Sequence, residues 1–291
     1  MKILLSDSFD ASLPGRLAKF GTVTDDKSAL PDCDVVLIRS KTKATADYLA
    51  GAPKLKIIIR GGVGLDNVDA NAARERGIKV FNTPEASSVA VAELAFAFLL
   101  AIPSKIIEGH TSMKEGKWLK SELKRTELFQ KTIGIIGVGR IGTQVAHRAK
   151  AFDMHVLGFD PYVKRHTLAE MTTLEDLCSR SDYITLHTPL NDETRGMIDA
   201  TLIDRMKNGV IIVNTGRGKS VVESDLAAAL ESGKVAAYGT DVWESDPPPQ
   251  TSPLLKAKNV YMCPHIGASS KENLLRIGDQ IVSILERELG K

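Results

Sequence analysis

Short apolar runs alternate along the chain with segments of helical periodicity, in two successive series. Most of these runs are apolar throughout, which is typical of parallel strands covered on both faces. The expected strands of the first series are Lys2–Leu5, Val35–Ile38, Ile57–Ile59 and Lys79–Phe81, and those of the second are Thr132–Ile136, His155–Phe159, Tyr183–Leu186, Val210–Val213, Val235–Tyr238 and Val260–Met262. This alternation predicts an α/β protein with two doubly wound parallel-sheet domains.

Two longer helical patterns set the expected domain boundaries. An apolar helix from about Ser87 to His110 leaves the first series and enters the second. The pattern Lys271–Glu288 follows the last strand, and folding back onto the first series would make that domain discontinuous. We therefore expect one domain from residues 1–84 and 267–291, and a second domain from residues 85–266.

Length, charge and cysteine content narrow the class of protein. The 291 residues suggest about two domains. A formal net charge of +2 argues against a chain-wide field for nucleic acid or membranes, and no apolar stretch approaches the ~20 residues that span a bilayer. Three dispersed cysteines without a C-x-x-C pair indicate free thiols in a reducing compartment. We expect a cytoplasmic protein without a metal site, a nucleic-acid partner or a membrane partner.

A glycine-rich turn is the main cofactor signal. Gly137, Gly139 and Gly142 form a G-x-G-x-x-G motif that follows an expected strand and opens the helical pattern Arg140–Ala151. In this context the glycines allow a tight turn, close approach of the backbone to a pyrophosphate and close helix–strand packing. The amides of Arg140 and Ile141 at the helix start would face the anion.

An acidic residue indicates which dinucleotide is bound. The strand after the glycine turn ends at Asp160, where a carboxylate accepts hydrogen bonds from the ribose hydroxyls and repels a 2′-phosphate. NAD is therefore favoured over NADP, although Lys164 and Arg165 lie close enough in sequence to weaken that preference.

Three polar residues follow successive strands of the second series. Arg217, Asp246 and His265 come after the strands Val210–Val213, Val235–Tyr238 and Val260–Met262. Ligands of such sheets bind beyond the carboxyl ends of the strands. An arginine holds a carboxylate or carbonyl oxygen in a fork, and a histidine exchanges a proton near neutral pH. Next to a nicotinamide cofactor, this set indicates redox chemistry on a small oxyacid.

Several motifs together make the chain resemble the D-isomer-specific 2-hydroxyacid dehydrogenase family over nearly its whole length. The matching stretches are RSKT (39–42), RGGVGLDNVD (60–69), FNTP (81–84), VAEL (91–94), GVGRIG (137–142), LHTP (186–189), NTGRG (214–218), GTDVWESDP (239–247) and CPHIGASS (263–270). The resemblance implies a Rossmann-type nucleotide domain with a discontinuous, flavodoxin-like substrate domain, and a cleft between them.

The resemblance implies catalytic roles for three residues. Arg217 would polarise the substrate, and His265 would donate or accept the proton. The family places the acidic partner of the histidine in a DVF-x-x-E-P motif, immediately before the proline. That position is Asp246 here, one methylene shorter than glutamate, and Glu244 is a substitute two residues off register. We favour Asp246 as the partner.

The resemblance also implies binding residues on both domains. Besides the glycine motif, the cofactor contacts implied by it are Arg140, Ile141, Asp160, Thr188, Pro189, Thr215, Asp241 and Gly267. The implied substrate contacts are Arg39, Ser40, Arg60, Gly61 and Gly62, with the amides of Gly61 and Gly62 and the Arg60 side chain holding the carboxylate, and with Lys41 or Lys43 aiding Arg39 on a phosphate. Ser87 stands where some relatives place asparagine, which is a departure from the family's pattern at a substrate contact.

Within the family, the PHIGAS form of the last motif favours the branch that oxidises D-3-phosphoglycerate to 3-phosphohydroxypyruvate in serine biosynthesis. Reduction of glyoxylate or hydroxypyruvate is the alternative reaction, and an NAD(H)-sensing, corepressor-like binding protein is the alternative class. The resemblance implies a homodimer. Because little sequence follows Glu288, we expect no C-terminal regulatory domain.

The remaining histidines have simpler interpretations. His187, in LHTP, is expected to be a strand-end histidine with satisfied hydrogen bonds rather than a second acid. The other four histidines show no metal-ligand spacing and are expected at the surface or in packing: His110, His147, His155 and His166.

Overall fold

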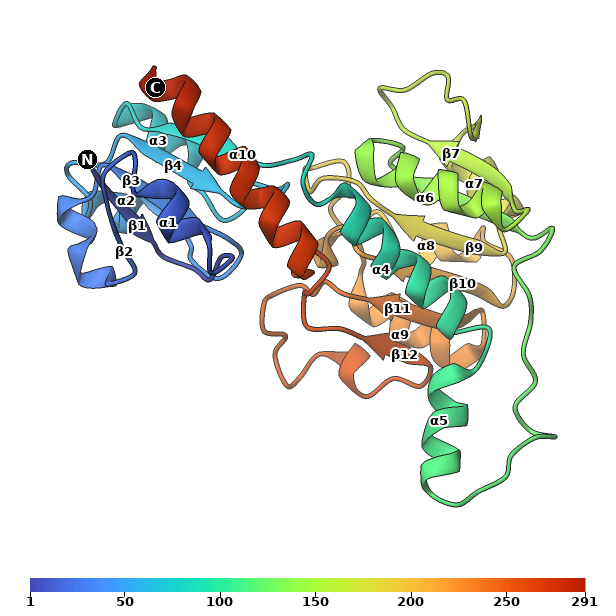
Figure 1. Ribbon diagram of the computed structural model, residues 1–291. Helices are drawn as coiled ribbons and strands as arrows, with labels where there is room; N and C mark the ends of the chain where they lie inside the picture. Colours follow the sequence, from blue (N-terminus) through green and yellow to red (C-terminus); the bar gives the residue numbers. More distant parts are fainter. Residues whose placement is uncertain (291) are drawn as a thin grey trace. The chain divides into compact units, whose positions relative to one another are not determined.

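The structure is a computed structural model and describes residues 1–290. The chain divides into two compact units (Figure 1). One contains Met1–Ala90 and the chain from Ala268 onward, and the other contains Val91–Gly267. The first unit is therefore discontinuous in sequence, and both of its boundaries fall slightly later in the chain than the predicted positions.

The first unit is built on a five-stranded parallel sheet in the order β2-β1-β3-β4-β5. This is the flavodoxin-like order, as the sequence implied. The strands are β1 (Lys2–Leu5), β2 (Thr22–Thr24), β3 (Val35–Ile38), β4 (Ile57–Arg60) and β5 (Lys79–Asn82), and the helices are α1 (Leu13–Leu17), η1 (Lys27–Asp32), α2 (Ala46–Ala50), α3 (Ala70–Glu75) and α10 (Lys271–Leu289).

The C-terminal helix α10 completes the core of the first unit. Its side chains Ile277 and Ile281 are fully buried and belong to the same core cluster as Ile3 and Ile59 of the sheet. Ser270 caps the helix, because its hydroxyl accepts a hydrogen bond from the Asn273 amide at 3.2 Å. The predicted return of this helix to the first unit is confirmed.

The second unit is built on a seven-stranded parallel sheet in the order β12-β11-β10-β9-β6-β7-β8. This is the Rossmann order with one additional strand, and the strand order reverses between β6 and β9. The strands are β6 (Thr132–Ile136), β7 (His155–Phe159), β8 (Glu170–Met171), β9 (Tyr183–Leu186), β10 (Val210–Asn214), β11 (Val235–Thr240) and β12 (Val260–Met262), and the helices are α4 (Ser88–Ala101), α5 (Ile106–Lys114), α6 (Arg140–Ala151), α7 (Leu174–Arg180), α8 (Ala200–Asp204), η2 (Gly218–Ser220), α9 (Glu223–Ser232) and η3 (Pro253–Leu255).

The predicted single helix from Ser87 to His110 is wrong. The structure has two helices, α4 and α5, whose axes differ in direction by 64°. Pro103 lies in the break and cannot donate to the helical ladder, and Lys105 adopts a left-handed backbone conformation with φ of 56°. Within residues 1–290 no single helix has the length and apolar character to cross a membrane, and α4 and α5 meet that criterion only as a bent pair.

Candidate active site

The glycine turn lies where the strand order of the second sheet reverses. Gly137 follows β6 with φ of +92°, and a Cβ there would lie 2.9 Å from the carbonyl carbon of His187 at the end of β9. A Cβ on Gly142 would lie only 2.1 Å from the Gly137 carbonyl oxygen, so helix α6 starts in direct contact with the turn. A Cβ on Gly139 would meet no atom within 4 Å. The turn is therefore tightly packed at two glycines and open at the third.

Two polar groups beside this turn fit a dinucleotide. The Asp160 carboxylate, at the end of β7, accepts hydrogen bonds from the amides of Val138 (3.2 Å) and Tyr162 (2.9 Å), which fix it next to the turn. The Thr188 hydroxyl is buried without a hydrogen-bond partner in the structure. Buried hydroxyls normally have partners, so this oxygen fits a role in binding a ligand. The residues present therefore suit a nicotinamide dinucleotide.

The loop after β10 presents Arg217. Asn214 is fully buried, and its side chain donates to the Arg217 carbonyl oxygen at 2.9 Å while accepting from the Gly216 amide at 3.0 Å. The half-buried Arg217 side chain donates to the Gly216 carbonyl oxygen at 2.8 Å. A buried side-chain amide that bonds two backbone groups of the turn that follows it fixes the backbone from which the guanidinium extends.

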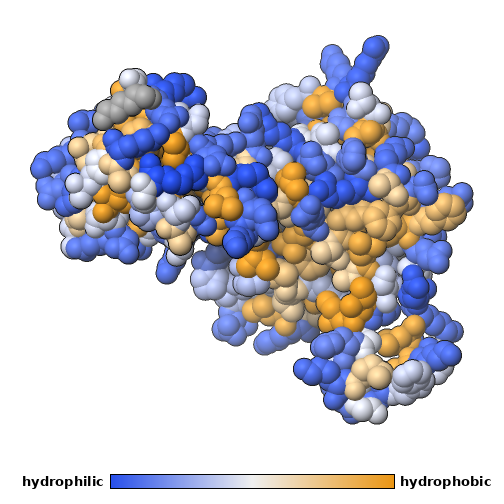
Figure 2. Space-filling model, viewed as in Figure 1, coloured by the Kyte–Doolittle hydropathy of each residue, from blue (hydrophilic) through white to orange (hydrophobic). Residues whose placement is uncertain are grey.

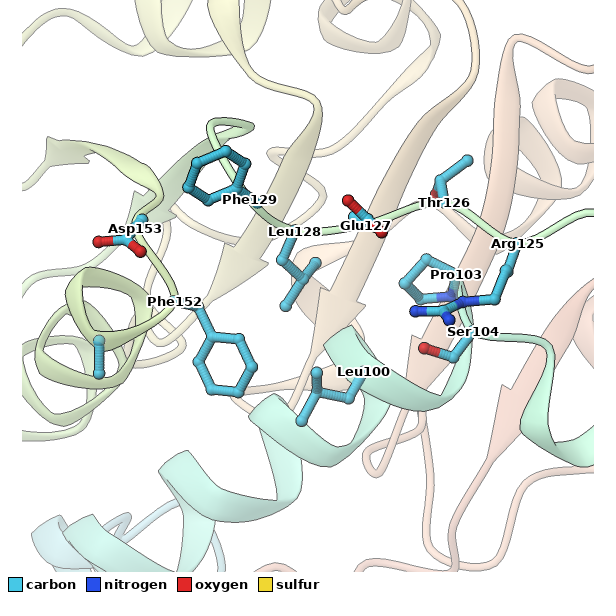
Figure 3. Close-up of a pocket in the computed structure, with 11 residues that line it drawn as sticks. Leu100, Pro103, Ser104, Arg125, Thr126, Glu127, Leu128, Phe129, Phe152 and Asp153 are labelled. Carbon is cyan, nitrogen blue, oxygen red and sulfur yellow. The ribbon is translucent and has the colours of Figure 1, made fainter.

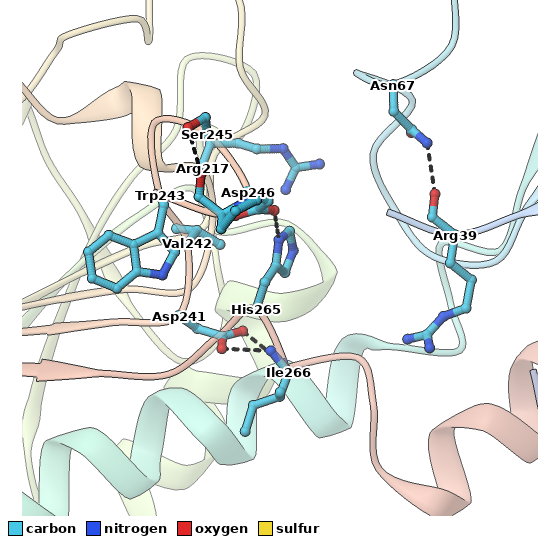
Figure 4. Close-up of polar contacts among 12 residues, drawn as sticks. Arg39, Asn67, Arg217, Asp241, Val242, Trp243, Ser245, Asp246, His265 and Ile266 are labelled. Carbon is cyan, nitrogen blue, oxygen red and sulfur yellow. Dashed lines mark hydrogen bonds and ion pairs between the residues drawn. The ribbon is translucent and has the colours of Figure 1, made fainter. Parts of the chain in front are cut away.

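The segment after β12 presents His265 in a left-handed backbone conformation, with φ of +55°. Few residues other than glycine adopt this conformation unless their surroundings hold them in it. Asp241, 2% exposed, accepts hydrogen bonds from the amides of Ile266 and Gly267, each at 2.7 Å (Figure 4 shows Asp241 with Ile266). Burial raises the pKa of Asp241, against the opposing effect of these two bonds and of nearby His265. Both Asp241 oxygens thus hold the histidine segment, and a contact with the cofactor stays a prediction.

Asp246 contacts His265 directly. One carboxylate oxygen lies against Nδ1 of the ring, and both side chains are partly exposed (Figure 4). Glu244 is exposed to solvent, and of the two candidate carboxylates it is Asp246 that the structure pairs with the histidine. A carboxylate on Nδ1 favours the protonated ring and leaves Nε2 for proton exchange with a substrate.

The loops that carry Arg217 and Asp246 are pressed together at Gly218. A Cβ on Gly218 would lie 2.0 Å from the carbonyl carbon of Trp243. The Trp243 indole in turn donates to the Cys263 carbonyl oxygen at 3.1 Å. Asn214, Gly218 and Trp243 have roles in the structure that their sequence positions do not predict. The only available signal was their position inside the matching motifs.

His187 has satisfied hydrogen bonds, as predicted. Its ring nitrogens lie 2.9 Å from the Thr185 hydroxyl and 3.5 Å from the Thr215 hydroxyl. Burial lowers the pKa of His187 to about 3, so the ring is neutral at pH 7. Among residues 1–290 no group of three or more His, Cys, Asp or Glu side chains is arranged to hold a metal ion.

In the first unit, two side chains shape the loop that contains Arg39. Asp7 accepts hydrogen bonds from the amides of Arg39 (2.6 Å) and Thr42 (3.1 Å), and Asn67 donates to the carbonyl oxygens of the same two residues. The Arg39 guanidinium donates to the Ala268 carbonyl oxygen at 2.9 Å and to the Ser269 hydroxyl at 3.2 Å (Figure 4 shows Arg39 with Asn67). One end of the Arg39 guanidinium therefore already has internal partners, whereas its Nε is buried without a hydrogen-bond partner.

The predicted use of the Gly61 and Gly62 amides on a substrate carboxylate is wrong for this backbone. The Gly61 amide donates to the Ile38 carbonyl oxygen, and the Gly62 amide donates to the Thr83 hydroxyl, both at 2.8 Å. Both donors are used inside the unit. Ser87 is fully buried, and its hydroxyl accepts from Asn273 at 3.3 Å, so it also serves packing.

Comparison with known proteins identifies the family. Residues 96–267 match the model of the D-isomer specific 2-hydroxyacid dehydrogenase, NAD binding domain. The chain belongs to this family. It is an oxidoreductase family with NAD as its cofactor, and the Rossmann order and the glycine turn of the second unit fit that cofactor.

Individual relatives in the family differ in substrate. The chain is 47% identical to the hydroxypyruvate reductase of Thermotoga maritima over 90% of its own length and 86% of the relative. It is 44% identical to the D-3-phosphoglycerate dehydrogenase of Methanocaldococcus jannaschii over 90% of its length, but it spans only 52% of that relative. Among solved structures, an NAD-dependent formate dehydrogenase from Staphylococcus aureus in complex with NAD matches with a TM-score of 0.88 and 33% identity, over 99% of this chain and 96% of that one.

Proposed function

We propose that the chain oxidises D-3-phosphoglycerate to 3-phosphohydroxypyruvate with NAD, with His265 as the acid–base residue. The direct contact between Asp246 and His265 Nδ1 carries this proposal. It gives the ring a fixed orientation and a counter-charge, while Arg217 approaches from the neighbouring loop.

In the proposed reaction the carbon that bears the hydroxyl group loses a hydride, and NAD, when bound beside the glycine turn, would supply the acceptor for it. His265 Nε2 takes the hydroxyl proton, so the products are a keto acid, NADH and a proton. Asp246 stabilises the imidazolium that forms. Arg217 donates hydrogen bonds to the oxygen that becomes a carbonyl and to the adjacent carboxylate, where its fixed planar fork offers two parallel donors.

Exposed cations in the Arg39 loop support a phosphorylated substrate. Lys41 and Lys43 are exposed on either side of the buried Thr42, and Asp7 and Asn67 fix the backbone between Arg39 and Thr42. A dianion favours several cationic donors on a fixed loop. We infer that Lys41 and Lys43, with Ser40 and Arg39, contact the phosphate, and that Arg60 contacts the carboxylate.

Reduction of hydroxypyruvate or glyoxylate is the second candidate function. It is favoured by the internal hydrogen bonds of Arg39, since the Nη2 group already donates to the Ala268 carbonyl oxygen and the Ser269 hydroxyl and is less available to a phosphate. The 86% coverage of the hydroxypyruvate reductase relative also favours it. An NAD(H)-sensing binding protein is the alternative class, and it predicts cofactor binding without turnover.

A substrate panel read by NADH absorbance at 340 nm tests these candidates with NAD and NADP. We expect the highest kcat/KM with D-3-phosphoglycerate and NAD. Lys41→Ala/Lys43→Ala should raise KM for that substrate about tenfold or more, and KM for hydroxypyruvate should change little. His265→Ala should lower kcat by about 10²–10⁴. Equal KM changes for both substrates would favour the unphosphorylated one, and cofactor binding without turnover would favour the sensor.

We further propose a cytoplasmic homodimer that uses the apolar surface along α4 and α5. Helix α4 has 14 residues, and Glu93 is its only charged residue. Figure 2 shows apolar side chains gathered along it. Beyond the break, Ile106, Met113 and Trp118 are exposed by 57, 56 and 74%. Contiguous apolar surface of this kind is typical of protein–protein contacts. Light scattering at micromolar concentration should give twice the chain mass, and a monomer would contradict the proposal.

A pocket of about 360 Å³ adjoins this surface (Figure 3). Leu100, Pro103, Leu128, Phe129 and Phe152 contribute its apolar lining. Residues 125–129 precede β6 and residues 151–153 precede β7, so the pocket lies at the amino ends of the strands. Ligands of parallel sheets bind at the opposite edge, and we therefore assign the pocket to the proposed dimer surface rather than to the substrate.

A further inference from the structure

Asp246 has a short side chain for its predicted task. Its carboxylate stands one bond closer to the backbone than that of a glutamate, and it still contacts His265 Nδ1 without a bridging group. The two residues come from different segments, one after β11 and the other after β12. Direct contact therefore requires that these two segments be held close together.

Trp243 joins the two segments next to the pair. Its indole Nε1 donates to the Cys263 carbonyl oxygen at 3.1 Å. Trp243 lies three residues before Asp246, and Cys263 lies two residues before His265, so this bond ties the chains immediately upstream of both side chains. Trp243 is only 8% exposed and packs in a core cluster of the second unit. An indole in such surroundings has little freedom to choose another acceptor.

The Arg217 loop supports Trp243 from another side. The position of a Cβ on Gly218 would be 2.0 Å from the Trp243 carbonyl carbon and 2.5 Å from its Cα. The Trp243 backbone is thus in contact with the Arg217 loop, while its indole bonds the histidine segment. One residue therefore contacts the segments that carry all three predicted catalytic side chains.

We propose that Trp243 is a positioning residue, whose indole N–H draws the Asp246 segment close enough to the His265 segment for an aspartate to reach the ring. This inference rests on the proposed acid–base role of His265. Two other ties join β11 to the histidine segment: the Cys263 amide donates to the Thr240 carbonyl oxygen, and Asp241 accepts from the Ile266 and Gly267 amides. Both come from residues before Trp243, so they hold the base of the loop and not the stretch that bears Asp246.

Trp243→Phe tests the inference, because it removes the donor and keeps an aromatic ring in the core. We expect kcat to fall about tenfold, which is the size of effect that loss of one hydrogen bond and a small displacement of a catalytic pair produce. KM for NAD should stay unchanged. The acid limb of the pH–rate profile should move to lower pH, because the carboxylate that stabilises the imidazolium has withdrawn. Ser232→Ala, which removes a side-chain hydrogen bond to the Ala229 carbonyl oxygen at the C-terminal end of helix α9, is the control and should keep the wild-type kcat and pH profile.

A longer acid should compensate for a loosened segment. In the native loop Asp246→Glu adds a methylene where the segments are held close, and we expect a several-fold loss of kcat. Combined with Trp243→Phe, the same change should restore kcat to within about threefold of wild type and return the acid limb to its original position. Such non-additive effects on kcat are expected when residues 243 and 246 both determine the distance between the carboxylate and the His265 ring.

The outcomes separate this inference from the proposed function. Independent losses that multiply in the double variant, or a folded Trp243→Phe enzyme with wild-type kcat and pH profile, would overturn the positioning role. If Trp243→Phe does not fold, Asp246→Glu alone decides, because wild-type kinetics in that variant would show that the spacing is not tight. Wild-type turnover in His265→Ala would instead remove the acid–base assignment itself.

Discussion

Gly218→Ala is expected to damage catalysis although the substitution adds one methyl group outside the reacting atoms. The new Cβ would lie 2.0 Å from the Trp243 carbonyl carbon and 2.1 Å from its oxygen, whereas real Cβ contacts are essentially never shorter than 3.0 Å. The atoms in question are backbone, so no side chain can rotate away. One of the two loops must move by about 1 Å.

Such a displacement reaches both predicted catalytic loops at once. Arg217 adjoins Gly218, and Asp246 follows Trp243 by three residues. A misplacement of about 1 Å can lower the rate about 10²-fold, and overpacking of this kind typically destabilises a protein by about 1–3 kcal/mol. We therefore expect kcat to fall about 10²-fold. The KM for NAD should rise by less, because the glycine turn follows β6 and only the implied cofactor contacts Thr215 and Asp241 adjoin the displaced loops.

Steady-state kinetics and thermal unfolding of the same preparations check this expectation. Gly15→Ala is the matched control, because a Cβ there meets nothing within 4 Å and the residue lies in helix α1. That variant should keep wild-type kcat and gain about 0.5–1 kcal/mol in stability. A folded Gly218→Ala protein with wild-type kcat would refute the argument that contact between the two loops sets the geometry of the site.

Three further perturbations have definite expected results. Asp246→Asn should shift the acid limb of the pH–rate profile to lower pH and Glu244→Gln should not, because only Asp246 contacts His265; a shift in Glu244→Gln alone would reverse the assignment. Burial lowers the pKa of His187 to about 3, so the folded protein holds this ring neutral while the unfolded chain protonates it near pH 6.5. The free energy of unfolding should therefore fall by up to about 1.4 kcal/mol per pH unit as the pH drops from 6.5 towards 3. Equilibrium unfolding of His187→Gln should lack this pH dependence. Asn67→Ala should raise KM for D-3-phosphoglycerate more than for hydroxypyruvate, because the Arg39 and Thr42 carbonyl oxygens lose their donor; equal KM changes would argue against a phosphate site on this loop.

The strands and the two-domain division could be predicted from the apolar pattern. Strands that are buried on both faces of a sheet consist of continuous apolar runs, which are easy to recognise in the sequence. All ten expected strands are present, some extended by one or two residues, and helix α6 matches its expected bounds of Arg140–Ala151. The two strands that were missed, Thr22–Thr24 and Glu170–Met171, are short and lie at sheet edges, where few apolar residues are required. The helix break at Pro103 was missed because the apolar pattern continues past it.

The site was predictable in its residue types but not in its hydrogen bonds. Position after a strand was enough to bring Arg217, Asp246 and His265 to one edge of the sheet. The backbone amides of Gly61 and Gly62 donate to Ile38 and Thr83. Both acceptors are distant in sequence, so the local motif does not indicate that these amides are already used. Buried polar ties such as those of Asn214 and Asp241 have no periodicity, so no pattern along the chain indicates their partners.

Sheet geometry explains why these ties are needed. The strands β10, β11 and β12 are consecutive neighbours, and neighbouring strands lie about 4.8 Å apart, so the backbones that lead to Arg217 and His265 start about two spacings apart. A substrate with two or three carbons is smaller than that separation, so the loops must bring the side chains inward. Several features bring these side chains inward. They are the left-handed backbone at His265, the absence of a side chain at Gly218 and the hydrogen bonds of Asn214, Asp241 and Trp243. It follows that the residues around the predicted catalytic set determine the geometry as much as the set itself, and a change in side-chain length at position 246 has to be judged together with position 243.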